Sequence, residues 1–95
     1  MKFSFYAIFQ YDSDGICVSF PDIPSALTCA PNEIAGIAYA KEALELALHK
    51  TLVRDLPAPS SAQQILLKEN QKLFLITIEM EAKEGRLWGR NVKDF

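Results

Sequence analysis

One long helical pattern constrains the fold of this chain more than any other feature. From Ile37, apolar side chains recur at i, i+3, i+7 and i+11, which is the spacing of one helix face. Asn32 is a good N-cap at the start of this pattern, and Pro57 forbids its continuation. We therefore expect a helix over residues 32–54 whose apolar stripe covers a small sheet. The other members of the stripe are Ile34, Ala40, Leu44, Ala47, Leu48 and Leu52.

Four short apolar segments predict the strands of that sheet. Residues 3–10 are apolar on both faces, which is typical of a central strand. Residues 16–20 alternate apolar and polar side chains, and Gly15 before them suits the positive φ of a hairpin loop. Residues 26–30 and 72–82 complete the set. The other face of the central strand is expected to pack on another chain.

These elements predict an α+β domain with the order β-β-β-α-β and a sheet of about four strands packed on one main helix. We expect the strand order third-second-first-last, with the last strand parallel to the first after a helical crossover. Ser61 and Gln64 form a capping-box pattern that predicts a short second helix over residues 61–67. The domain spans residues 1–82. Residues 86–95 are either a hairpin partner or part of a loose tail over 83–95, which is too short for a DNA-binding domain.

Composition narrows the class of protein. The 95 residues suit one domain, and 49% hydrophobic with 23% charged residues is an ordinary globular composition. The net charge of −2 argues against nucleic-acid binding over the whole surface. No apolar run approaches the roughly 20 residues that cross a bilayer, so no membrane association and a cytoplasmic location are expected.

The two cysteines have no metal-binding or redox-motif spacing. If the second and third strands pair about residue 23, Cys17 and Cys29 lie near one another. We expect buried, unpaired thiols in a reducing compartment, with a disulfide as the alternative.

No catalytic constellation is visible, so we expect no enzyme activity, no metal and no cofactor. His49 is the only histidine, and its place on the polar side of the helix predicts a solvated side chain. A metal-dependent nuclease needs several inward carboxylates, but Asp12, Asp14 and Asp22 all fall in turns.

Two sets of residues are candidates for partner binding. Tyr39, Leu46 and Val53 lie roughly 160–200° from Ile37 on an ideal helix, and so face away from the sheet. An aligned apolar line of this kind is typical of an interface. The second set surrounds Trp88 near the C-terminus, where basic side chains beside an aromatic ring suit either RNA or a protein partner. Its basic members are Lys83, Arg86, Arg90 and Lys93.

The segments YAIFQYDSDGICVSFPDIPSALT, AKEALELALHKTL and PAPSS, in this order, resemble the N-terminal domain of HicB antitoxins. The likeness covers residues 6–61. It implies a fold similar to a reduced RNase H domain, a homodimer or higher homo-oligomer, and a partner of the HicA type. HicA toxins are small ribonucleases with a catalytic histidine, and the antitoxin masks that enzyme.

Two departures from the family pattern are visible. Ser25-Ala26 stands where the family usually has Gly-Cys. The family also commonly adds a DNA-binding domain after the last strand, for which residues 83–95 leave no room. We therefore expect an antitoxin-like protein that masks a HicA-like ribonuclease. The alternatives are an RNA-binding module that uses the basic aromatic tail, and a purely structural oligomeric domain.

Overall fold

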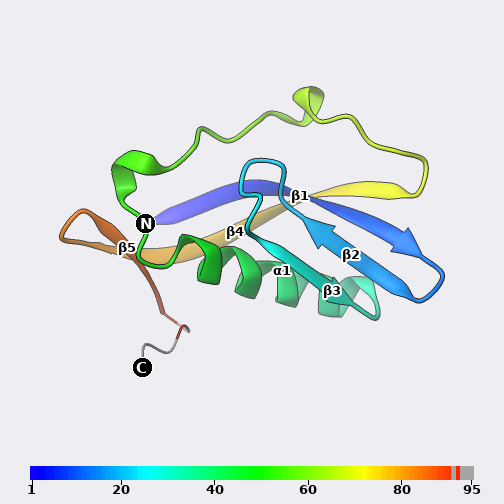
Figure 1. Ribbon diagram of the computed structural model, residues 1–95, viewed down its shortest axis with the longest axis horizontal. Coiled ribbons are helices and arrows are strands. Elements are labelled where there is room, and N and C mark those ends of the chain that lie inside the picture. Colours follow the sequence, from blue (N-terminus) through cyan, green and yellow to red (C-terminus); the bar gives the residue numbers. More distant parts are fainter. Residues whose placement is uncertain (91, 93–95) are drawn as a thin grey trace.

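One helix, α1 (Glu33–Leu48), packs on one face of a five-stranded sheet in the computed structural model, which describes residues 1–90 and 92 (Figure 1). The sheet order is β3-β2-β1-β4-β5, and every pair of neighbours is antiparallel. This confirms the α+β class, the central first strand and the order of the first four strands. The strands are β1 (Lys2–Asp12), β2 (Gly15–Ser19), β3 (Leu27–Ala30), β4 (Gln71–Lys83) and β5 (Arg86–Gly89).

The expected parallel pairing of the first and last strands is wrong. β4 runs antiparallel to β1, in a register that extends from Lys2 opposite Glu79 to Gln10 opposite Gln71. The crossover rule assumes that the helix alone returns the chain to the sheet. Here residues 49–70 follow α1 and travel back along the molecule before β4 begins, which reverses the direction of that strand (Figure 1).

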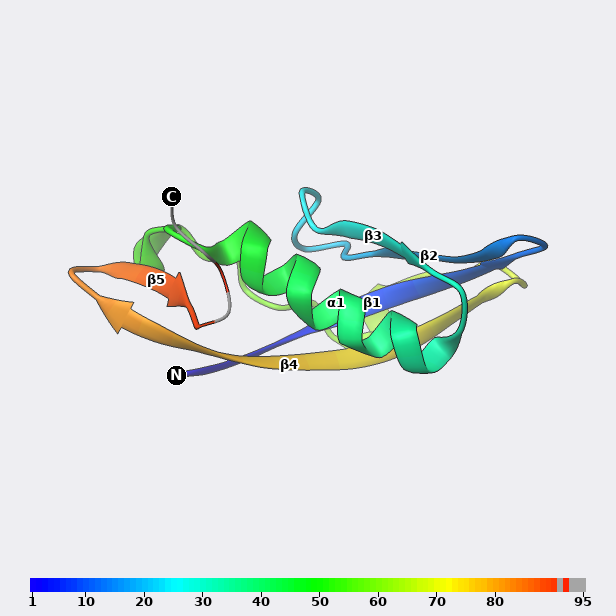
Figure 2. The same ribbon diagram turned by 90° about the horizontal axis from the view of Figure 1, so that it is seen from below.

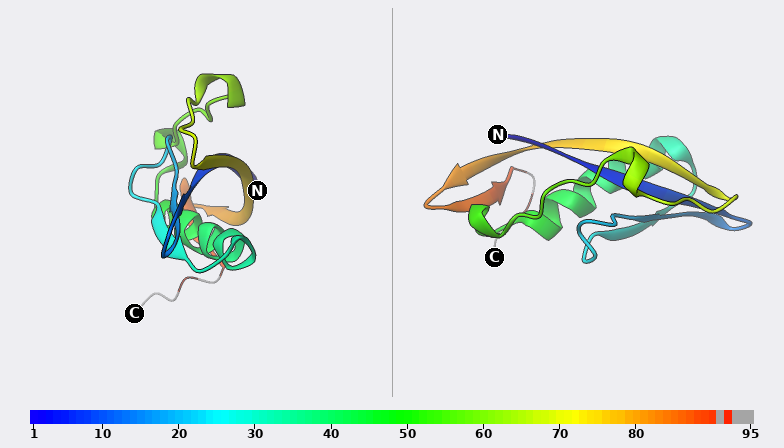
Figure 3. Two further views of the ribbon diagram at one scale, coloured as in Figure 1. Left: turned by 90° about the vertical axis from the view of Figure 1, so that its right-hand side faces the viewer. Right: turned by 90° about the horizontal axis from the view of Figure 1, so that it is seen from above.

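Beyond the 3₁₀ turn Val53–Asp55, the connection runs along the side of β1 away from α1, as the end-on view in Figure 3 shows. The Asp22 carboxylate holds this segment by accepting bonds from the Ser60 amide at 2.7 Å and the Ser60 hydroxyl at 2.6 Å. The Tyr11 amide donates to the Asn70 carbonyl at 2.8 Å. The connection is thus attached to the β2–β3 loop and to the end of β1.

The start of α1 follows the sequence pattern, and its end does not. The Asn32 side chain accepts from the Ala35 amide at 2.9 Å, as an N-cap should. The helix then ends at Leu48, six residues before the predicted Arg54. Lys50 takes a left-handed backbone conformation with φ of 69°, which interrupts the helical path.

Hydrogen bonds to β5 account for the early end of the helix. The Lys50 amide donates to the Leu87 carbonyl at 2.7 Å, and the Leu87 amide donates to the Thr51 carbonyl at 2.9 Å. Leu52 forms a further bridge with Arg86. Residues 50–52 therefore pair with the outer edge of β5 instead of forming another helical turn. Figure 2 shows α1 ending beside this hairpin.

The predicted second helix is reduced to a single 3₁₀ turn, Ala62–Gln64. Its capping interaction is present, because the Gln64 side chain accepts from the Ser61 amide at 2.8 Å. Leu66 and Leu67, which a helix over residues 61–67 would have buried, are exposed. A longer helix here would bury no apolar face against the domain, and so would lack the packing that stabilises helices in proteins.

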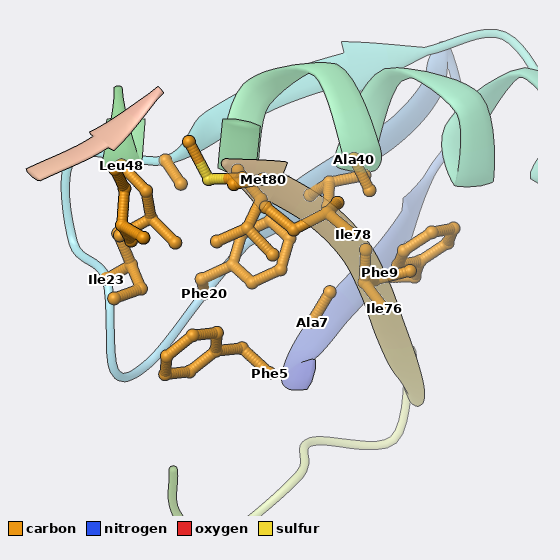
Figure 4. Packing of buried hydrophobic residues seen from close by; sticks show 14 of the residues in the cluster. Phe5, Ala7, Phe9, Phe20, Ile23, Ala40, Leu48, Ile76, Ile78 and Met80 are labelled. Atoms are coloured by element: carbon orange, nitrogen blue, oxygen red, sulfur yellow. The ribbon is translucent and has the colours of Figure 1, made fainter. Parts of the chain in front are cut away.

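The core lies between α1 and the inner face of the sheet (Figure 4). The predicted alternation of buried and outward-facing side chains along β1 and β4 is confirmed. On α1 the buried face is centred on Ala40 and Leu44, and Ile37, the expected centre, is only partly buried. A Cβ atom at Gly36 would lie 2.8 Å from the Phe9 ring, so this glycine lets the ring pack directly on the helix. The strand residues in the core are Phe5, Ala7, Phe9, Ile16, Val18, Ala30, Ile76, Ile78, Met80 and Leu87.

The segment after β4 belongs to the sheet. Lys83 opposite Arg86 closes a hairpin through the predicted turn at Glu84 and Gly85, and Leu87 in β5 is completely buried. This confirms the hairpin alternative for residues 86–89. Lys93, the last basic residue of the expected tail, lies outside the described residues.

Candidate functional site

Tyr39 and Leu46 are exposed on the same side of α1, as the sequence predicts. Their exposed fractions are 41% and 64%, and Leu27 of β3 is 66% exposed beside them. These three side chains line one shallow hollow together with Thr28, Glu42 and Ala43. We call Leu27, Tyr39, Ala43 and Leu46 the α1–β3 surface. A cluster of exposed apolar side chains spanning two elements is typical of a protein-binding site.

Leu27 is a member of this surface that the sequence analysis missed. Ala26 and Ala30 are buried, whereas Leu27 and Cys29 are exposed. Successive side chains of a strand point to opposite faces. The alternation of residues 26–30 therefore already indicated that Leu27 faces outward, but its place beside α1 comes only from the structure.

Val53 is not part of the α1–β3 surface, so its predicted place there is wrong. The helix ends before it, and Val53 lies in the short 3₁₀ turn Val53–Asp55. Its side chain is half-buried against the core, and its amide donates to the Gly85 carbonyl at 2.8 Å. A helical projection has no meaning beyond the last helical residue.

Arg86, Trp88 and Arg90 lie together at the β4–β5 hairpin, and each makes a contact within the protein. Arg86 Nη1 donates to the Lys50 carbonyl at 2.8 Å. Trp88 is half-buried, and its Nε1 donates to the carbonyl of Lys83 at 3.2 Å. Arg90 Nη2 lies 3.6 Å from Glu79 Oε1. The Arg86 bond ties the hairpin to the segment after α1, whereas the other two contacts lie within the hairpin region.

The described hairpin does not present a basic surface. Three carboxylates, from Glu79, Glu81 and Glu84, accompany three basic side chains in residues 79–90. Binding of single-stranded nucleic acid uses a positively charged groove with accessible aromatic rings. The balanced charge and the half-buried Trp88 fit such a groove poorly.

His49 is packed in the structure, and the predicted solvated histidine is wrong. Its Nδ1 accepts from the Gly89 amide at 3.0 Å, and its ring meets the edge of Trp88 at a centroid distance of 5.5 Å. The tertiary contact with β5 decides this environment. A neutral histidine that accepts at Nδ1 carries its proton on Nε2. His49 thus connects the end of α1 to the last strand.

Residues 1–90 and 92 contain few groupings of side chains that could do chemistry. No group of three or more His, Cys, Asp or Glu side chains within this range is arranged to hold a metal ion. Of the three turn aspartates, Asp22 is used structurally, since it accepts both bonds from Ser60. No helix in the same range has the length and apolarity that a membrane crossing requires.

A small polar cluster joins β1, α1 and β4 at the start of the helix. The Tyr11 hydroxyl donates to Glu33, and Lys72 Nζ lies 3.6 Å from Glu33 Oε1 and 5.3 Å from the Tyr11 ring centroid. Burial, followed by the Glu33 bond, raises the pKa of Tyr11 to about 12. The Tyr11 hydrogen bond, together with Lys72, lowers the pKa of Glu33 despite partial desolvation.

Glu33→Gln is expected to lower the pKa of Tyr11 without returning it to about 10, the ordinary tyrosine value. The negative charge is lost, while the burial remains. In the wild-type protein, the raised pKa stabilises the fold fully below about pH 10, and that contribution is lost as pH rises toward 12. Ultraviolet absorbance of tyrosinate measures the shift, and Tyr11→Phe identifies which of the tyrosines moves. An unchanged Tyr11 titration in Glu33→Gln would contradict the assigned contact.

No protein-family model matches the chain, and the search of curated proteins finds no match. The likeness to HicB antitoxins therefore rests on its motifs. In the structure, these motifs form the β1–β2 hairpin, α1 and a bend after β2 whose Phe20 and Ile23 enter the core.

Proposed function

We propose that this protein is a non-enzymatic, antitoxin-like protein that binds and masks a small ribonuclease similar to HicA. The observation that carries the proposal is the α1–β3 surface. Leu27, Tyr39 and Leu46 are exposed around one hollow, although each could have been a polar residue without loss of core packing. An inhibitor that occludes an enzyme needs surface of this kind and no chemistry of its own.

The charge of the chain suits a ribonuclease as the partner. An enzyme that acts on RNA binds phosphates, so its active face carries lysine or arginine. This chain has a net charge of −2, and the carboxylate of Glu42 lies in the hollow of the α1–β3 surface. An apolar contact with a carboxylate at its edge therefore complements a basic enzyme face.

Self-association is part of the same proposal. Tyr6, Ile8 and Leu73 are half-buried on the sheet face opposite α1, and Leu75 on that face is exposed. A second copy that covers this face would explain why β1 and β4 are apolar on both sides. We propose a homodimer or higher homo-oligomer that leaves the α1–β3 surface free for the toxin, in the cytoplasm where such a ribonuclease acts.

The alternative function is RNA binding through the β4–β5 hairpin. Arg86 and Arg90 are exposed beside Trp88, which favours it. The carboxylates on the same hairpin and the internal contacts of all three residues weigh against it. RNA binding by the hairpin would fall steeply with salt, since it would depend on a few phosphate contacts.

Co-expression tests the proposal against this alternative. The chain is produced together with a small basic protein encoded by a neighbouring gene, and co-purification and relief of growth arrest are scored. We expect a stable complex and restored growth. If no complex forms and the isolated chain instead retains RNA on filters in a strongly salt-dependent way, the RNA-binding alternative replaces the antitoxin proposal.

A further inference from the structure

Cys17 and Cys29 form an exposed pair of thiols across the β2–β3 hairpin. They lie directly opposite one another in the strand register, and their Sγ atoms are 3.6 Å apart. Both are free and exposed, so the expectation of buried thiols is wrong, while their predicted proximity is confirmed. Directly opposed residues of antiparallel strands have Cα atoms about 4.5–5.5 Å apart, within the range of about 4.4–6.8 Å that a disulfide spans.

We propose that Cys17 and Cys29 are a reversible oxidation site that closes an intrachain disulfide by exchange with a low-molecular-weight disulfide. The sheet already places both strands, so closure requires the side chains to rotate and little backbone movement. The exposed position gives the oxidant access to either sulfur. The inference does not depend on toxin binding, but it requires that a second copy on this sheet face leaves the β2–β3 end accessible, because Cys17 and Cys29 share the face of Ile8.

With oxidised glutathione as the oxidant, the exchange proceeds in two steps. A thiolate of one cysteine attacks the glutathione disulfide, which forms a mixed disulfide and releases one glutathione thiolate. The thiolate of the second cysteine then attacks the protein sulfur of that mixed disulfide, forms the Cys17–Cys29 bond and releases the second glutathione thiolate. The protein loses two thiol protons and two electrons, and oxidised glutathione becomes two reduced glutathione molecules.

The surroundings of Cys17 disfavour its thiolate, and so slow an attack by Cys17 at neutral pH. The neighbouring Cys29 raises the pKa of the Cys17 thiol, and partial desolvation and Asp12 add to the effect. The attacking species is the thiolate, whose fraction rises about tenfold per pH unit below the pKa. The oxidation rate should therefore rise steeply with pH.

The new bond would connect the edge strand β3 to β2 and close the loop between them. That loop contains the bend with Pro21 and Pro24, and its closure restricts the unfolded chain. We expect the oxidised protein to melt several degrees higher than the reduced protein, because the closed loop has fewer unfolded conformations.

The full chain, first reduced, is incubated with oxidised glutathione at about pH 7 and about pH 9, and its intact mass and free thiols are measured. We expect the loss of two hydrogen atoms and of both thiols, faster at the higher pH and reversed by dithiothreitol. The Cys17→Ser and Cys29→Ser variants, checked for folding by circular dichroism, should instead accumulate a mixed disulfide with one glutathione. A wild-type chain that keeps both thiols, carries one glutathione on each, or forms intermolecular dimers would overturn the proposal.

Discussion

Leu44→Ala is expected to lower the free energy of unfolding by about 2–5 kcal/mol. Leu44 is fully buried at the centre of the helix face, where it belongs to the same core cluster as Phe9 and Ile76. Removing its side chain loses apolar contacts and leaves a cavity that neighbouring rings cannot fill without moving. Urea unfolding followed by circular dichroism measures the loss.

Leu46→Ala on the same helix is the matched control. Leu46 is 64% exposed, so the same change in side chain should alter stability by no more than about 0.5 kcal/mol. Equal losses at both positions would mean that α1 is rotated relative to the core contacts described above. A loss below about 0.5 kcal/mol at Leu44 would have the same meaning.

Leu46→Glu is expected to weaken toxin capture by roughly 30-fold or more while leaving the fold intact. A carboxylate buried at an interface loses its hydration without gaining a partner, and a central contact of this kind carries about 2 kcal/mol or more. The substitution does not disturb the core, because the side chain already points to solvent. Affinity for the co-purifying basic protein, measured by calorimetry, gives the change.

Leu66→Glu provides the control for a general effect of added charge. Leu66 is 92% exposed, lies in the connection between α1 and β4, and does not line the hollow of the α1–β3 surface. It should leave both stability and toxin capture unchanged. If Leu66→Glu weakens capture as much as Leu46→Glu does, or if neither weakens it, the α1–β3 surface is not the toxin-binding site.

Local patterns were sufficient to predict most of the elements. The alternation of apolar residues in β1 and β4, the Asn32 N-cap and the turn at Gly15 all appear in the structure as the sequence indicates. Each of these features depends on neighbours within a few residues. A strand or helix that buries one face repeats its apolar residues with the period of that element, so the sequence alone shows the pattern.

The candidate surface was predictable in part for the same reason. Tyr39 and Leu46 face outward because they lie opposite the buried stripe of one continuous helix. Val53 was assigned to the same line only because the helix was expected to continue past Leu48. Leu27 comes from another element, and no pattern within the helix could have brought it to the hollow.

The sequence by itself determined where strands and the helix begin, which faces they bury and that Cys17 lies near Cys29. Only the tertiary structure decided where α1 ends, which way β4 runs and how His49 is packed. Those three outcomes depend on hydrogen bonds and packing between residues far apart in the chain, such as Lys50 with Leu87 and His49 with Gly89. The local pattern of apolar residues cannot predict such pairings, because the backbone amide of any residue other than proline can make them.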